Sequence, residues 1–419
     1  MFRHTTKTLP VAVLFAVILA APGARAQVAI QCPGDLNGDA VPDPYLLKPN
    51  GTPNTKQPNP AYRENVKCMH LGAGDGYVTM ADGRRLYMFG FSDLTGVPSD
   101  MAMMAGMLSA SFPAPTISVD EGDELYLTLT NVGMMNRPDL FDPHTVHWHG
   151  FPNAAPVFDG VPEASISINM GASLTYYYKV VQPGTYMYHC HVEATEHMQM
   201  GMLGNLYVRP AQNKLAGGAA LAGGFTHQDG YKYAYNDGDG STRYDVDAVI
   251  QIGSFDPDFH DASENVQPLP FANMRDRYTM LNGRGYPDTV NPGALPPAVG
   301  GSGKSTQVVS SLVTAVKGQR ILLRISNLNV TRFYTLGTVG LPMRIVGNSA
   351  RLLRGPGGKD LSYMTSSVTL GGGESLDAII DTSSLAPGTY FLYSKKLSDL
   401  NNYLEDFGGM MTEIVITAQ

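Results

Sequence analysis

Hydrophobic and polar residues alternate in short stretches along most of this chain, which is the pattern of β-strands with one buried face. Two clear examples are EGDELYLTLTN (121–131) and PGTYMYHCH (183–191). The chain of 419 residues also contains 46 glycines and 29 prolines, which favour turns between strands. The pattern predicts an all-β protein that is longer than one ordinary domain.

The strand patterns occur twice along the chain. EGDELYLTLTN is matched by KGQRILLRISN (317–327), and PGTYMYHCH is matched by PGTYFLYSK (387–395). Between the two copies lies AQNKLAGGAALAGG (211–224), whose small residues are typical of a flexible linker. The sequence therefore predicts a tandem of two related β-sandwiches.

The first 26 residues have the pattern of a secretory signal peptide: Arg3 and Lys7 precede an apolar run over 11–20, and Ala-Arg-Ala closes the segment. No later stretch is long and apolar enough to predict a transmembrane helix. We expect an exported protein, periplasmic or secreted. The predicted order is a signal peptide (1–26), an N-terminal extension (27–76), a first sandwich (77–210), a linker (211–225) and a second sandwich (226–419).

Charge and cysteine usage narrow the function further. The signal peptide contains three of the 29 basic residues and no acidic residue, so 26 basic and 37 acidic residues remain after its removal. The resulting formal charge of −11 excludes nucleic acid as a partner. In an oxidising compartment Cys32 and Cys68 can form a disulfide bond within the extension. Cys190 is left over, and an odd cysteine in an exported protein is explained by a reactive thiol, an unmatched structural cysteine or a metal ligand.

The surroundings of Cys190 favour the metal ligand. The stretch HCHVEATEHMQMGM (189–202) places Cys190 between two histidines and adds a further histidine and a methionine. A thiolate, imidazoles and a distant thioether are the donors of a blue-copper electron-transfer centre. Upstream, HTVHWHG (144–150) contains alternating histidines, which point to one face of a strand and can reach a shared metal.

Together with FDGVPEASISINMGASLTYYY (158–178), these motifs resemble the multicopper oxidase family, from about Thr79 to the C-terminus. The resemblance implies two cupredoxin-like Greek-key β-sandwiches, a copper cofactor and an oxidase that passes single electrons from a small-molecule or metal-ion reductant to dioxygen. It implies that Asp159 relays protons, with an ordinary turn aspartate as the alternative. It also implies two sets of ligands: His144, Cys190, His197 and Met202 for a type 1 copper, and His147, His149, His189 and His191 for a type 2/type 3 copper site.

The chain also departs from the family pattern. Six residues separate Cys190 from His197, more than in the common oxidase loop. A complete trinuclear cluster takes eight histidines from two sandwiches, and this chain supplies four from one. In the second copy, YSK (393–395) stands where HCH (189–191) stands in the first. Either two copies of the first domain meet in a homo-oligomer, or the second metal site is smaller. His227 and His260 lack ligand spacing and are interpreted as loop or surface residues.

Other functions remain as alternatives. A copper nitrite reductase, which the chain resembles distantly, would need an aspartate at the position of His147. An electron carrier without turnover would equally explain the lack of histidine ligands in the second sandwich. A purely structural sandwich leaves the surroundings of Cys190 unexplained. The reductant itself is open, because phenols, Fe(II), Cu(I) and Mn(II) all donate to such sites.

A second metal is suggested near the N-terminus, where DLNGDAVPD places oxygen donors at intervals close to those of an EF-hand calcium loop. The donors are Asp35, Asn37, Asp39 and Asp43. Ala40 stands where the sharp turn needs glycine, and no glutamate closes the loop. Calcium binding and an Asx-rich turn are therefore equal alternatives.

Overall fold

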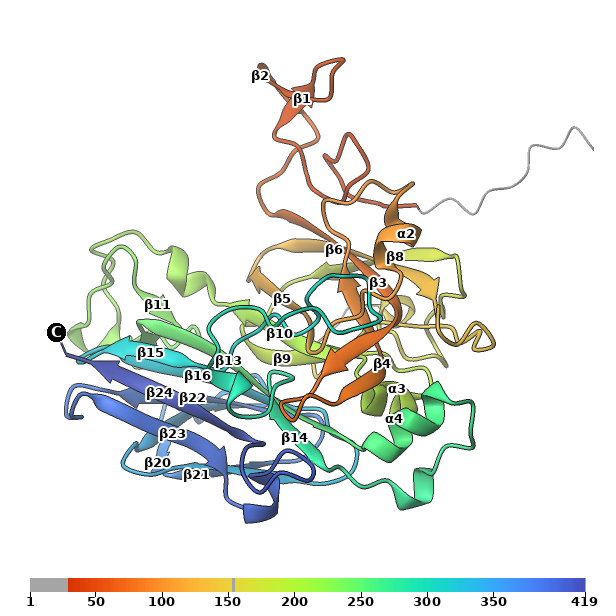
Figure 1. The fold of residues 1–419 in the computed structure, drawn as a ribbon. Coiled ribbons are helices and arrows are strands. Elements are labelled where there is room, and N and C mark those ends of the chain that lie inside the picture. Colours follow the sequence, from red (N-terminus) through yellow and green to blue (C-terminus); the bar gives the residue numbers. More distant parts are fainter. Residues whose placement is uncertain (1–28, 153–154, 419) are drawn as a thin grey trace, which may run out of the picture.

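The computed structural model describes residues 29–152 and 155–418, so the predicted signal peptide lies outside the described part of the chain. Two β-sandwiches lie side by side, and an N-terminal extension with the hairpin β1 (Tyr45–Leu47) and β2 (Pro53–Pro58) projects from the first (Figure 1). Among the described helices, none has the length and apolar character needed to cross a membrane. The all-β prediction is confirmed.

The first sandwich consists of two four-stranded sheets, ordered β4-β3-β6-β8 and β5-β10-β9-β7. Its core gathers alternate apolar residues from both sheets, including Leu127, Trp148 and Leu206. The strand β3 begins at Val66 and pairs with β6 in parallel, so the predicted domain boundary at residue 77 falls inside a strand. The strands are β3 (Val66–Thr79), β4 (Arg85–Asp93), β5 (Ala114–Asp120), β6 (Glu124–Gly133), β7 (His147–His149), β8 (Ser173–Lys179), β9 (Gly184–His189) and β10 (Leu203–Arg209).

The second sandwich repeats this arrangement. Its sheets are ordered β14-β13-β16-β22-β18-β19, with β20 paired to β18, and β15-β24-β23-β17-β21. The parallel pairs β3/β6 and β5/β10 of the first sandwich return as β13/β16 and β15/β24. The strands are β13 (Val246–Phe255), β14 (Tyr278–Leu281), β15 (Val313–Val316), β16 (Arg320–Asn327), β17 (Tyr334–Thr338), β18 (Met343–Asn348), β19 (Arg351–Leu352), β20 (Tyr363–Thr365), β21 (Ser367–Leu370), β22 (Glu374–Asp381), β23 (Gly388–Ser394) and β24 (Met411–Thr417).

The segment between the sandwiches is packed rather than loose. Two 3₁₀ helices, η2 (Ala211–Lys214) and η3 (Ala222–Gly224), occupy the predicted linker, and buried Gln212 donates a hydrogen bond to Asp237 at 2.8 Å. The short pair β11 (Lys232–Tyr233) and β12 (Arg243–Tyr244) follows. The remaining helices are η1 (Pro156–Phe158), η4 (Phe271–Asn273), η5 (Asp288–Val290), η6 (Leu397–Asp399), α2 (Ala102–Gly106), α3 (Ala194–Met200) and α4 (Pro257–Glu264).

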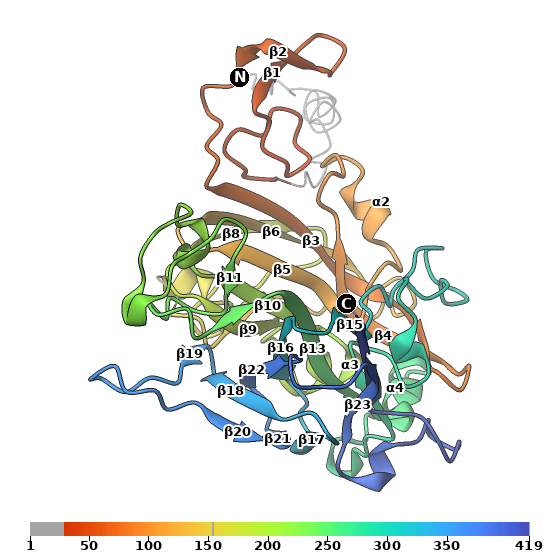
Figure 2. The same cartoon turned by 90° about the vertical axis from the view of Figure 1, so that its left-hand side faces the viewer.

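Strand β9 contacts β16 and β22 of the second sandwich (Figure 2). The contact is polar: the Thr185 hydroxyl donates to Asp377 at 2.6 Å, and the Ser375 hydroxyl donates to the Thr185 carbonyl at 2.6 Å. Arg324, which is fully buried, pairs with Asp247 at 2.9 Å and lies 3.8 Å from Asp377. The second sandwich is therefore held against the strand that leads to Cys190.

Two predictions for the N-terminal extension can be compared with the structure. The disulfide bond between Cys32 and Cys68 is present and ties the extension to β3. In the DLNGDAVPD loop, the Asp35 carboxylate accepts hydrogen bonds from the Gly38 and Ala40 amides at 2.7 and 2.9 Å. Ala40 has a φ of +65°, at the position where a calcium loop needs glycine. The loop has Asx-type turns, and calcium stays a prediction.

Candidate metal centre

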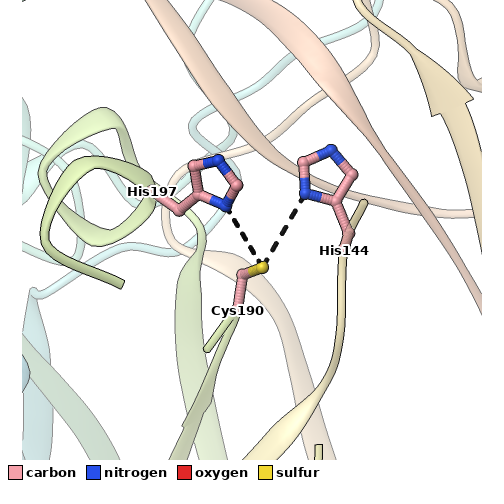
Figure 3. Close-up of side chains that lie close together, drawn as sticks. All are labelled: His144, Cys190 and His197. Carbon is pink, nitrogen blue, oxygen red and sulfur yellow. Dashed lines mark hydrogen bonds between the residues drawn. The ribbon is translucent and has the colours of Figure 1, made fainter. Parts of the chain in front are cut away.

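Cys190 follows the last residue of β9, and its sulfur faces two imidazole rings (Figure 3). The Cys190 Sγ lies 3.3 Å from the Nδ1 of His197 and 3.7 Å from the Nδ1 of His144. All three side chains are buried, and their donor atoms lie within 4.8 Å of one another. Three of the four predicted type 1 ligands therefore form one buried cluster.

The backbone explains how these residues meet. The Cys190 amide donates to the Met202 carbonyl at 3.1 Å, so the chain leaves β9, forms α3 with His197, and returns beside Cys190. His144 lies outside the strand: its amide and carbonyl pair with Ile168 at 3.0 and 2.9 Å. The strand expected over 144–150 is consequently shortened to β7, because His144 pairs with another segment.

The buried cluster suits copper in its donor chemistry, because a soft sulfur and two imidazoles converge from separate segments. Burial raises the pKa of the Cys190 thiol to about 12 and lowers the pKa of His197 to about 4. The pKa of His144 is also lowered well below its ordinary value by burial. Without a metal, the cluster is thus uncharged at neutral pH, and a thiolate-bound cation must displace the thiol proton.

One side of this cluster leads toward solvent. The Nε2 of His197 is buried without a hydrogen-bond partner and lies 4.0 Å from the Oδ2 of Asp142, whose side chain is 21% exposed. Burial raises the pKa of Asp142. Nothing in the sequence around Asp142 distinguishes it from other loop aspartates, so it was not among the predicted site residues.

The other four predicted histidines form a second cluster. Antiparallel pairing of β7 with β9 sets His147 opposite His189, and His149 Nδ1 lies 3.4 Å from His189 Nε2. Donor atoms of these three residues lie within 4.8 Å of one another. The ring of His191 stands beside them, 5.2 Å from the ring of His147 between centroids. Trp148, which lies between two of the histidines in sequence, packs in the core and stacks on Tyr178 at 3.9 Å.

Hydrogen bonds to carbonyl oxygens orient two of these rings. His147 Nδ1 donates to the Asp159 carbonyl at 2.6 Å, and His189 Nδ1 donates to the Cys190 carbonyl at 2.8 Å. A carbonyl can only accept, so each Nδ1 carries the proton and each Nε2 keeps a lone pair for a metal. The Asp159 carboxylate, 37% exposed, lies 3.6 Å from His147 Nδ1. Its role as a proton relay stays a prediction.

The four histidines line a cavity of about 560 Å³ between the two sandwiches. Its other wall belongs to the second sandwich and consists of residues 328–333 and 372–373. This wall was not predicted, because it has no metal-ligand motif. The interpretation of His260 as a loop or surface residue is wrong, because it is buried on α4 and contacts the Gln199 carbonyl at 3.0 Å. His227 lies in a loop, as predicted, but it is buried rather than on the surface.

Gly373 of the second sandwich lies against the histidine cluster. It has a φ of +90°, and a Cβ added there would lie 2.6 Å from His149 Nε2.

Gly373→Ala should therefore lower the free energy of unfolding by about 1 kcal/mol and also displace His149. We expect weaker copper binding at the histidines, measured by copper titration. Gly230→Ala is the matched control, because Gly230 has a φ of +87° with nothing within 4 Å; equal copper loss in both variants would contradict this account.

Met202 is joined to Cys190 by a backbone hydrogen bond. Its backbone lies beside Cys190, its side chain is fully buried, and axial ligation by its thioether stays a prediction. The second sandwich has the same backbone arrangement: the Ser394 amide donates to the Met410 carbonyl at 2.9 Å. Ser394 thus stands at the place of Cys190, as the alignment of the two copies predicts.

Comparison with known proteins agrees with the geometry. Residues 95–213 match the family model described as multicopper oxidase. Multicopper oxidase MCE of Talaromyces pinophilus is 36% identical over 120 residues, 28% of this chain and 18% of that protein. Laccase 1 of Metarhizium acridum is 32% identical over 121 residues, with 28% and 18% covered. The matched part thus spans under a fifth of these relatives.

Solved structures resemble the fold of both sandwiches. The blue copper oxidase of Nitrosomonas europaea aligns with a TM-score of 0.60 at 22% identity, over 84% of this chain and 86% of that chain. A copper nitrite reductase of the same organism aligns with a TM-score of 0.52 at 17% identity, over 84% and 94%. Residues 95–213 are therefore similar to the multicopper oxidase domain, and they lie within a tandem of two sandwiches whose fold is that of these copper proteins.

Proposed function

We propose that this protein is an exported oxidoreductase that takes single electrons from a reductant and delivers them to dioxygen. His144, Cys190, His197 and Met202 would hold a type 1 copper. His147, His149, His189 and His191 would hold the copper at which dioxygen binds. When bound, copper supplies a one-electron acceptor at the cysteine and a dioxygen site at the histidines.

One observation carries this proposal: Cys190 and His189 are neighbours in the chain but belong to different clusters. The sulfur of Cys190 faces His144 and His197, while the ring of His189 faces His149 across 3.4 Å. A short covalent path therefore connects the two clusters. Such a connection serves electron transfer, whereas an isolated copper store would not need it.

The outer sides of the two clusters suit the supply of electrons and protons. His197 Nε2 points toward Asp142, so a small-molecule or metal-ion reductant would dock near this aspartate. Asp159 is partly exposed and contacts His147, so it would pass protons from solvent toward the cavity. Export and calcium in the DLNGDAVPD loop are further proposals.

Reduction and reoxidation of the copper-loaded protein test this function. The blue absorption should bleach when a substituted phenol or Fe(II) is added without oxygen, and it should return when oxygen is admitted. Bleaching without return in oxygen would contradict the oxidase and identify an electron carrier. Return with nitrite but not with oxygen would identify a nitrite reductase instead.

A further inference from the structure

The histidine cavity is bounded by both sandwiches of a single chain. His147, His149, His189 and His191 supply one side, and residues 328–333 and 372–373 of the second sandwich supply the other. Gly373 stands directly against His149. The face at which a second copy could add imidazoles is therefore partly covered by this chain itself.

The polar side chains of the covering wall have partners of their own. Asn329 accepts from the Ser254 hydroxyl at 2.8 Å and donates to the Ile252 carbonyl at 3.1 Å. Arg332 pairs with Asp399 at 2.9 Å, and its guanidinium is a cation that does not bind copper. Thr331 donates to Asp276. All wall residues are described, and none is a histidine, so the imidazole donors come from the first sandwich alone.

Three of the histidines bring one ring nitrogen each into close proximity. Carbonyl oxygens engage the Nδ1 atoms of His147 and His189, so the Nε2 atom of each ring keeps its lone pair. His149 has its Nε2 against Gly373, and its Nδ1 faces His189. Three donor atoms within 4.8 Å of one another suit one ion. A trinuclear cluster would need further imidazoles, and the described wall provides none.

We propose that the histidine cavity holds a single copper ion on three of the four histidines, His147, His149 and His189, without His191. The site is completed within one chain, with an open position toward the cavity for a small anion or dioxygen. This deepens the proposed function and rests on it for the second copper, at Cys190. A loaded chain then contains two copper ions. The four histidines allow either a smaller metal site or a cluster shared between the first domains of two copies. The covered cavity favours the smaller metal site.

Copper content and spin count test this proposal. We expect two copper atoms per chain by elemental analysis, and two unpaired spins per chain by electron paramagnetic resonance, because separate Cu(II) ions are both visible. Monomers isolated by sedimentation should also contain two copper atoms per chain. Three or more copper atoms per chain, fewer spins than copper atoms, or copper held only in oligomers would overturn it.

Two variants separate the proposal from the function on which it rests. His149→Gln should remove one copper atom and leave the blue absorption, and Cys190→Ser should remove the blue copper and leave the other. Azide added to the Cys190→Ser protein should change the remaining resonance signal, because the open position accepts a small anion. No copper in the Cys190→Ser protein would refute the histidine site, whereas a missing blue signal in the parent protein would refute only the proposed function.

Discussion

Replacing Cys190 by serine is expected to abolish the blue colour of the copper-loaded protein and its oxygen uptake together. The Cys190 sulfur is the one soft anion that faces His144 and His197, and a hydroxyl is a much poorer copper ligand. The fold should survive, because Ser394 occupies the corresponding place in the second sandwich with the same backbone hydrogen bond. Visible absorption and oxygen uptake measure the effect, and thermal unfolding serves as the control.

The Cys190→Ser variant should also lose the release of a thiol proton that accompanies copper binding. Between the pKa of His197, about 4, and that of the Cys190 thiol, about 12, the metal-free cluster contains a protonated thiol and a neutral imidazole. Copper binding must release the thiol proton, so affinity should rise about tenfold per pH unit across neutral pH. A pH indicator should detect this proton in the parent protein. Blue colour in the serine variant, or copper uptake by the parent without proton release, would show that the sulfur is not a ligand.

Arg324→Met should cause the largest loss of stability, about 3 to 5 kcal/mol, because it leaves a buried charge without its partner. Arg324 is fully buried, pairs with Asp247 and stacks on Tyr207 at 4.8 Å. It also faces buried Asp377, which accepts a hydrogen bond from Thr185 of the first sandwich. Burial raises the pKa of Asp377, and Arg324 opposes this shift. Denaturant unfolding measures the loss of free energy.

Arg63→Met provides the matched control for Arg324. Arg63 pairs with Glu124 at 3.3 Å, but its side chain is 49% exposed, so its removal should cost less than about 1 kcal/mol. Adding Asp377→Asn to Arg324→Met should restore part of the lost stability, because it removes the uncompensated charge. Equal losses for Arg63→Met and Arg324→Met would show that the buried ion pair contributes no more stability than an exposed one.

The sequence suffices to predict the ligand-bearing elements because strand pairing brings short motifs together. HTVHWHG and PGTYMYHCH pair as β7 and β9, which sets His147 opposite His189. The match between Ser394 and Cys190 was also visible, because both copies keep the strand pattern around the site. Local patterns therefore identify most side chains of the two clusters.

What the sequence does not reveal is how the two sandwiches dock. The wall over residues 328–333 contains no recognisable ligand pattern, and its position depends on contacts between residues far apart, such as Thr185 with Asp377. His260 illustrates the same limit, because its burial depends on α4 packing against the first sandwich. Asp142 becomes notable only through its distance from His197.

The central claim is that Cys190, His144 and His197 hold a blue copper, and electron paramagnetic resonance of the copper-loaded protein tests it most directly. The account predicts one signal with the narrow copper hyperfine splitting of a thiolate-bound type 1 site, which disappears in Cys190→Ser. A spectrum with only the wide splitting of copper bound by nitrogen and oxygen would contradict it.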